Sequence, residues 1–304
     1  MSKVLIGVDK SGSYRVYLTI TTDMVEEARN IHMMTPLATA GLGRVLTATG
    51  LMSIMLKGQR DRMTVIFRGD GPAKQILASG YADGRIKGYI SNPDVDLPLT
   101  KEGKLDVGGS LGIGELTVIK DLGLKDPYHG SIALVSGEIA DDLTAYYFIS
   151  EQQNTSIGLG VKINKDKSVL AAGGMFVQMI PGAEDEAITE LEKMIEDMPP
   201  LTSIIEETMN NGSGKTEEGL LVDLMDRIFG SLSEEYKPEV LEYKDIVLEC
   251  DCSEERMAQA LMTIGKKDLE EIVREDGQAE LSCHFCGSKY TFEKELLEEM
   301  LSKM

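Results

Sequence analysis

The four cysteines constrain this chain more than any other feature of its sequence. They form two close pairs, Cys250-x-Cys252 and Cys283-x-x-Cys286, with 30 residues between the pairs. All four lie within 37 of the 304 residues, and residues 1–249 contain none. A tetrahedral zinc site needs four soft ligands, which two close pairs of thiolates supply. The spacing therefore favours one Zn²⁺ per chain held by Cys250, Cys252, Cys283 and Cys286.

Two other uses of paired cysteines fit the sequence less well. Structural disulfides belong to oxidising compartments, but the first residues lack the apolar core of a secretory signal, and we find no apolar run of about 18 residues that could span a bilayer. We therefore expect a cytoplasmic protein with reduced thiols and no membrane partner. Iron–sulfur clusters use denser runs of cysteine than this one. His284 is an alternative ligand, but it lies inside the second pair and is expected to face solvent.

The net charge of -20 is concentrated in the C-terminal part of the chain. Residues 1–180 carry 19 acidic and 19 basic side chains, whereas residues 181–304 carry 32 acidic and 12 basic ones. The glycines follow the same division, with 23 of the 31 before residue 181. These shifts predict a boundary near Pro181-Gly182. A chain this acidic is not expected to bind nucleic acid, which requires basic residues against phosphates.

The first 180 residues predict a domain that mixes helices with groups of strands. Alternating apolar and β-branched residues indicate strands at 3–8, 14–20, 64–67, 85–90, 114–119, 130–135 and 158–163. Helices are expected at 24–32, 36–56 and 141–150, the second of them buried because it is rich in Ala, Leu and Met. Because the strands come in groups and do not alternate strictly with helices, the fold class is α+β.

The remaining residues predict a helical linker and a small domain that a bound metal stabilises. Ile188, Leu191, Ile195 and Met198 lie on one helical face, and Pro199-Pro200 ends that helix. In the last part, a strand at 246–248 leads to the first cysteine pair, and helices at 253–262, 267–274 and 293–303 surround a hairpin at 281–292. We therefore expect a core domain with a mixed α/β sheet over residues 1–180, a helical linker over 181–235 and a zinc-binding domain over 236–304.

No pattern in the sequence indicates a catalytic or nucleotide site. The Gly-x-Gly pairs at 41/43, 112/114 and 158/160 lack the third glycine of a dinucleotide fingerprint. The loop Gly212-Ser213-Gly214-Lys215-Thr216 resembles a phosphate loop, but Met209 stands where its first glycine is required. His32 and His129 are isolated and read as structural. We expect no enzyme activity and no bound nucleotide.

The cysteine spacing, at the acidic C-terminus of a chain this long, resembles the 33 kDa redox-regulated heat-shock chaperone family of bacteria. Segments of the first 180 residues resemble the same family. They are Phe67-Arg68-Gly69-Asp70-Gly71-Pro72, Gly84 to Tyr89 with Asn92-Pro93, Gly112 to Leu116, Pro127-Tyr128-His129-Gly130, and Ser150-Glu151-Gln152 with Thr155. The resemblance covers essentially the whole chain.

The resemblance implies an ATP-independent holdase that oxidation activates. In this reading the reduced cysteines bind zinc and keep the chaperone inactive. Oxidants then form the family's disulfides, Cys250–Cys252 and Cys283–Cys286, zinc is released, and a surface for unfolding client proteins is exposed. Active members of the family tend to form homodimers.

Two further functions remain open on the residues alone. The zinc site is also compatible with a constitutive, zinc-stabilised module for protein interactions in which the metal is never released. A thiol–disulfide oxidoreductase that uses Cys283-x-x-Cys286 is less well supported, because the pair lacks a clear thioredoxin-type βαβ context.

Overall fold

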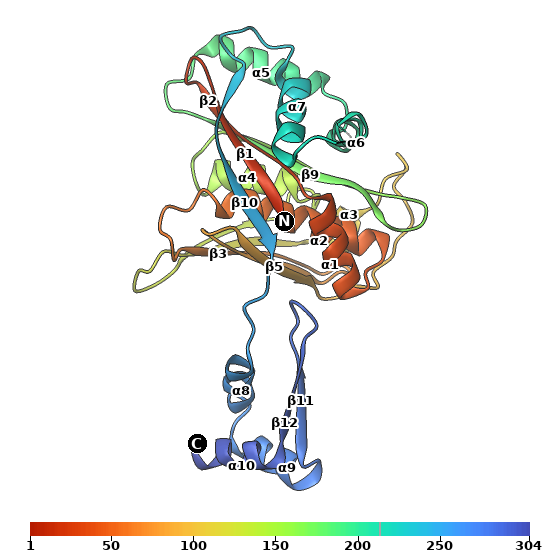
Figure 1. The fold of residues 1–304 in the computed structure, drawn as a ribbon, viewed down its shortest axis with the longest axis vertical. Coiled ribbons are helices and arrows are strands. Elements are labelled where there is room, and N and C mark those ends of the chain that lie inside the picture. The colour runs from red at the N-terminus through yellow and green to blue at the C-terminus, as the bar shows by residue number, and fades with distance from the viewer. Residues whose placement is uncertain (213) are drawn as a thin grey trace. The chain divides into compact units, whose positions relative to one another are not determined.

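The computed structural model describes residues 1–212 and 214–304, so Ser213 of the loop at 212–216 lies outside the described residues. The chain divides into two compact units, Met1–Leu248 and Glu249–Met304 (Figure 1). The mixture of a large sheet with helices confirms the predicted α+β class. Among the described residues, no helix is both long enough and apolar enough to cross a membrane.

A ten-stranded sheet forms the frame of the first unit, with the order β7-β6-β3-β4-β5-β10-β1-β2-β9-β8. Its strands are β1 (Ser2–Asp9), β2 (Tyr14–Ile20), β3 (Arg62–Gly69), β4 (Gln75–Tyr81), β5 (Arg85–Ile90), β6 (Gly114–Asp121), β7 (Tyr128–Ala133), β8 (Thr155–Ile163), β9 (Val169–Met179) and β10 (Pro238–Leu248). Neighbouring strands are antiparallel, except that β10 runs parallel to β5.

Among its described residues, the first unit has seven helices in addition to this sheet. They are α1 (Thr22–His32), α2 (Pro36–Ser53), α3 (Val107–Leu111), α4 (Ala140–Ile149), α5 (Asp185–Asp197), α6 (Leu201–Asn211) and α7 (Glu217–Phe229). Figure 1 shows α5, α6 and α7 together on one side of β1, β2 and β9.

Helix α2 forms the centre of the main core. It starts at Pro36 with a side-chain cap, because the hydroxyl of Thr35 accepts a hydrogen bond from the amide of Ala38. All of its residues are buried except Pro36 and Arg44. Such a helix has no solvent-facing stripe, which explains why its sequence is apolar on every side.

A second core lies between the sheet and helices α5 to α7. It joins Leu5, Val16 and Leu18 of the strands to Leu191 of α5 and Phe229 of α7. The acidic polar faces of these helices stay in solvent, while their apolar stripes pack on the sheet, as an amphipathic helix requires. The predicted linker is therefore a packed layer of the first unit.

The position of β10, the last strand of the first unit, differs from the predicted domain division. The sequence placed 236–304 in one domain, with residues 246–248 as a strand of the zinc-binding part. In the structure those residues end β10, and β10 pairs with β1 and β5 in the large sheet. Ile246 is fully buried there. The observed division is at Leu248/Glu249, because the apolar end of β10 is buried in the first unit's core.

The second unit is small and follows β10 directly. It contains α8 (Glu254–Met262), α9 (Lys266–Glu275), the hairpin strands β11 (Gln278–Ser282) and β12 (Lys289–Glu293), and α10 (Lys294–Ser302). Ser253 caps α8 through its hydroxyl, as expected. The unit's described apolar core has five buried residues, Leu261, Leu269, Phe292, Leu297 and Met300. A core of this size gives a 56-residue unit little stability of its own.

Candidate metal centre

The four cysteines meet at one point of the second unit. Their Sγ atoms all lie within 4.8 Å of one another. Sγ of Cys250 is 3.7 Å from Sγ of Cys283, and Sγ of Cys252 is 3.4 Å from Sγ of Cys286. A disulfide would bring two sulfurs to about 2.05 Å, so all four thiols are free in this state.

Two short segments bring the cysteines together. Cys250 and Cys252 follow directly on the end of β10, and Ser253 then starts α8. Cys283 and Cys286 lie in the turn that joins β11 to β12. The amide of Gly287 donates to the carbonyl oxygen of Cys283 at 2.8 Å. Gly287 adopts a φ of 71°, a conformation in which a side chain would be strained, so glycine suits this turn.

Burial and hydrogen bonding set the acidity of the thiols. Burial raises the pKa of Cys250 and of Cys283. Burial acts in the same direction on Cys286, but hydrogen bonds from the hydroxyl and amide of Ser288, together with the neighbouring thiols, bring its pKa down to about 7. Four partly buried thiols cannot all ionise side by side without a cation, because each negative charge disfavours the next.

This donor set fits zinc. Four thiolates around Zn²⁺, with Zn–S bonds of about 2.3 Å, have their sulfurs about 3.8 Å apart at the corners of a tetrahedron. The Cys250–Cys283 and Cys252–Cys286 Sγ···Sγ separations, 3.7 and 3.4 Å, lie close to that value. A divalent cation also supplies the charge that the buried thiolates require. The cluster is thus a candidate metal centre that needs little rearrangement.

Two polar neighbours of the cluster were not found from the sequence. The hydroxyl of Tyr290, on β12, lies 3.1 Å from Sγ of Cys252, and Oγ of Ser288 lies 3.2 Å from Sγ of Cys286. The contact with Cys252 is the main reason why the pKa of Tyr290 rises to about 12. The available signal was the presence of hydroxyl residues just after a Cys-x-x-Cys pair: Ser288 directly precedes β12, and Tyr290 lies on it.

The other candidates from the sequence do not belong to this group of cysteines. His284 is exposed and does not belong to the group of four possible ligands among the described residues. Gly41 and Gly43 lie inside α2, and Gly158 and Gly160 lie inside β8. Thr216, at the end of the loop at 212–216, caps α7 by accepting a hydrogen bond from the amide of Gly219. Thr216 therefore has a structural role as the cap of α7.

Fold and site together define a chain with a large α+β unit and a small unit in which four cysteines form a candidate metal centre. A sequence model of the Hsp33 protein family matches residues 2–293. The 33 kDa chaperonin of Alkaliphilus oremlandii (strain OhILAs) is 43% identical over 302 residues, covering 99% of this chain and 96% of its own length. That of Bacillus subtilis (strain 168) is 42% identical over 288 residues, covering 94% of each.

A solved structure is similar along the whole chain as well. The crystal structure of the 33 kDa chaperonin (heat shock protein 33 homolog) from Thermotoga maritima matches with a TM-score of 0.87 and 35% identity, covering 99% of this chain and 98% of the other. The chain therefore belongs to the Hsp33 family. It is a chaperone rather than an enzyme, and its partners are unfolded client proteins.

Proposed function

We propose that this chain is a redox-switched holdase whose switch is the four-cysteine centre. The observation that carries the proposal is the meeting of Cys250, Cys252, Cys283 and Cys286 in a unit with a small apolar core. When bound, Zn²⁺ would link the segment with Cys250 and Cys252 to the turn with Cys283 and Cys286. It would also keep the sulfurs as thiolates, the form that oxidants attack. Each protein chain would hold one zinc ion.

Oxidation would remove the ligands in pairs. Two thiolates lose two electrons to one peroxide molecule, which takes up two protons from solvent, so that one disulfide and two molecules of water form. Disulfide sulfurs are no longer thiolate ligands, so the second unit loses the contribution that metal binding makes to its folding. Its five-residue core is then too small to hold it folded. The unit opens, and client-binding surface becomes accessible.

The proposed disulfides are Cys250–Cys252 and Cys283–Cys286, as the family resemblance implies. Trypsin can separate this pairing from the crossed one, because Arg256, Lys266 and Arg274 lie between the two cysteine pairs. Local disulfides leave the two pairs on separate peptides, each lighter by two hydrogens. Crossed disulfides would join Cys250 to Cys283 and Cys252 to Cys286, whose Sγ atoms now lie 3.7 and 3.4 Å apart. They would leave the two peptides covalently joined.

The proposal extends to assembly and location. We propose that the oxidised chain forms a homodimer and that it works in the cytoplasm, where thiols are normally reduced and oxidation is therefore a signal. Light scattering of the reduced and oxidised protein tests the first point. A dimer that forms only after oxidation supports it, and a constant mass contradicts it.

The deciding experiment follows zinc, thiols and activity in one sample. Reduced, zinc-loaded protein is treated with peroxide at raised temperature, and released zinc, free thiols and suppression of client aggregation are measured over time. Loss of one zinc and four thiols per chain, together with a gain of activity, is the expected result. Retained zinc, or lost zinc without activity, would indicate a constitutive zinc-stabilised interaction module. Reduction of insulin disulfides would indicate an oxidoreductase.

A further inference from the structure

A hollow in the first unit differs in charge from the rest of this acidic chain. It has a volume of ≈ 810 Å³ and lies between α2, the loop before α3, the end of β8 with the turn that follows it, and the start of α6. Every charged side chain among its described lining residues is basic: Arg44, Lys104, Lys162, Lys165 and Lys167. In a chain of net charge -20, a surface without a binding function would be expected to carry acidic side chains as well. This hollow has five basic lining residues and no acidic one among the described residues.

Only two of the five cations have an ion-pair partner among the described residues. Arg44 pairs with Glu138 at 2.6 Å, and Lys162 pairs with Glu206 at 2.7 Å. In the part of the chain that the structure describes, Lys104, Lys165 and Lys167 have no carboxylate within 4.0 Å of the ammonium group. Lys165 and Lys167 therefore remain uncompensated, and Lys104 is compensated only at longer range, by Glu102. A concave site lined by one sign of charge concentrates ions of the opposite sign.

The nearest acidic neighbours in the sequence are engaged elsewhere. The carboxylate of Asp106 accepts a hydrogen bond from the amide of Gly109, and that of Asp166 accepts hydrogen bonds from the amide and hydroxyl of Ser168. Neither aspartate lines the hollow. Asp166 therefore does not cancel the charge of Lys165 and Lys167, and Asp106 does not cancel that of Lys104. Glu102 does not line the hollow either, but it lies near enough to Lys104 for that ammonium to help lower the pKa of its carboxyl.

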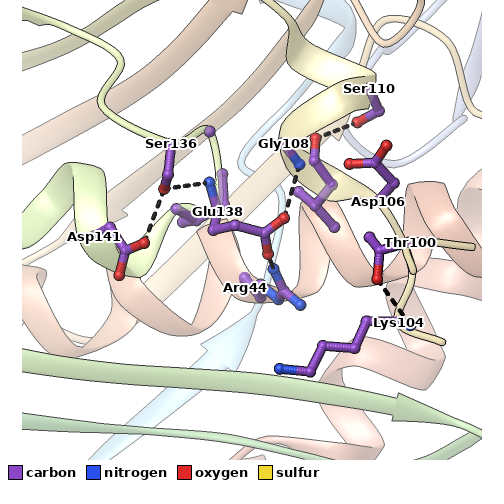
Figure 2. Close-up of polar contacts among 12 residues, drawn as sticks. Arg44, Thr100, Lys104, Asp106, Gly108, Ser110, Ser136, Glu138 and Asp141 are labelled. Atoms are coloured by element: carbon purple, nitrogen blue, oxygen red, sulfur yellow. Dashed lines mark hydrogen bonds and ion pairs between the residues drawn. The ribbon is translucent and has the colours of Figure 1, made fainter. Parts of the chain in front are cut away.

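The side chain of Arg44 is held in a fixed position at the hollow. Pro36 and Arg44 are the two residues of α2 that are not buried, and both line the hollow. Figure 2 shows how Glu138 holds the guanidinium: one carboxylate oxygen accepts from Arg44, and the other accepts from the amide of Gly108. Nε of Arg44 is buried and has no hydrogen-bond partner in the described structure. An otherwise uncharged helix thus holds one cation in a fixed position at this surface.

The start of α6 adds to the positive field. Pro200, Leu201, Thr202 and Ser203 line the hollow, and α6 begins without a side-chain cap. The first amides of an uncapped helix lack intrahelical partners and favour anions, phosphates in particular. Here this effect acts in the same volume as the five basic side chains and strengthens the same preference.

We propose that this hollow is a binding site for a small multivalent phosphate anion, with inorganic triphosphate as the simplest ligand of this kind. Lysine is a common phosphate ligand, since its ammonium acts as a point charge, and a triphosphate carries enough negative charge to compensate the three unpaired lysines. A volume of ≈ 810 Å³ lies within the usual range for small-molecule sites. The bound anion would tie α6 to the turn after β8 and to the loop that holds Lys104.

The test measures binding to the full, reduced, zinc-loaded chain by titration calorimetry. Inorganic triphosphate and ATP are the probes, each at low and moderate salt. We expect one anion per chain, a higher melting temperature of the first unit and affinity that falls with salt. Equal affinities assign recognition to the phosphates alone, whereas tighter ATP binding adds the apolar lining around Leu99 and Leu105. Absence of binding by both probes overturns the proposal.

Variants then locate the site. The Lys165→Ala/Lys167→Ala double variant and the Lys104→Ala variant are expected to bind about fivefold more weakly for each lysine removed, the upper range for an exposed ion pair. Lys125→Ala is the matched control, because Lys125 is exposed and does not line the hollow. Equal losses in the control and the hollow variants overturn the assignment. If an oligoglutamate peptide binds more tightly than triphosphate, the proposal that the hollow binds a phosphate anion is overturned.

Discussion

The hydroxyl of Tyr290 lies 3.1 Å from Sγ of Cys252, on the strand that leaves the Cys283–Cys286 turn. The contact therefore joins one cysteine pair to the strand that follows the other. A hydroxyl beside a thiolate ligand can donate a hydrogen bond to it and so stabilise its negative charge.

Tyr290→Phe should accordingly weaken the metal centre without removing a ligand. The loss of a partner of this kind lowers metal affinity about tenfold or more, and we expect that effect in competition with a chromogenic zinc chelator. Cys252 should also react faster with peroxide, because its sulfur loses a stabilising contact. Tyr243→Phe, on β10, is the control. Unchanged zinc affinity in the Tyr290 variant would show that the hydroxyl does not support the ligand.

Removal of the metal should unfold the second unit and leave the first one folded. The second unit has a five-residue apolar core, whereas the first has two large cores of its own. Hydrogen exchange of the reduced protein, with and without a strong chelator, should show lost protection in residues 249–304 and unchanged protection in β1, β2 and β9. Cys283→Ser should reproduce this pattern, and Ser282→Ala should not. Protection that is independent of chelator contradicts a structural role for the metal.

Two glycines of β8 provide a paired test of how α6 packs. A Cβ atom on Gly160 would lie 2.4 Å from Cγ2 of Thr202, whereas a Cβ on Gly158 would lie no closer than 3.6 Å to any of its neighbours. Gly160→Ala should therefore lower the free energy of unfolding of the first unit by about 1–3 kcal/mol, as overpacking does. Gly158→Ala should change it by about 0.5 kcal/mol or less. Urea unfolding measures both, and equal effects would show that α6 does not pack closely on β8.

His32 should make the first unit sensitive to mild acid. Burial lowers its pKa, although the contact of Nε2 with the carbonyl oxygen of Gly88, at 3.1 Å, opposes that shift. The unfolded chain therefore binds a proton at His32 more readily than the folded chain, so this contribution to stability is lost as pH falls through about 6.5 and below. His32→Gln should flatten the fall in unfolding free energy between pH 7.5 and pH 5. An identical pH dependence in both proteins would exclude His32 as its source.

Local sequence patterns predicted many elements of the fold closely. The buried helix expected at 36–56 is α2, and the capped helix expected at 253–262 is α8. Helix α6 extends through Asn210 and Asn211, whose helix propensity is low, because its buried face, with Ile204 and Ile205, stabilises it. Strand β4 was missed, since Ala78, Ser79 and Gly80 have little β-propensity and are held by pairing on both sides.

The pairing of distant segments was beyond the reach of such patterns. Residues 246–248 carry a clear strand pattern, but it does not say that their partners are residues 85–86 and the first strand of the chain. The meeting of the four cysteines was predictable, because two close cysteine pairs in one reduced chain are expected to share one metal ion. The basic hollow was not, because Arg44 and Lys165 are 121 positions apart and only the packing of α2 beside β8 brings them to one surface.

The position of β10 has a consequence for how the protein is made. This strand lies between β5 and β1, so it joins the two halves of the sheet, yet it is the last strand of the first unit to be synthesised. While the ribosome is still producing residues 1–237, each half-sheet has an open edge where β10 will lie, and such edges readily pair with other chains. A nascent chaperone of this kind is therefore itself at risk of aggregation, and a ribosome that stalls before residue 248 would release a fragment that cannot close its own sheet.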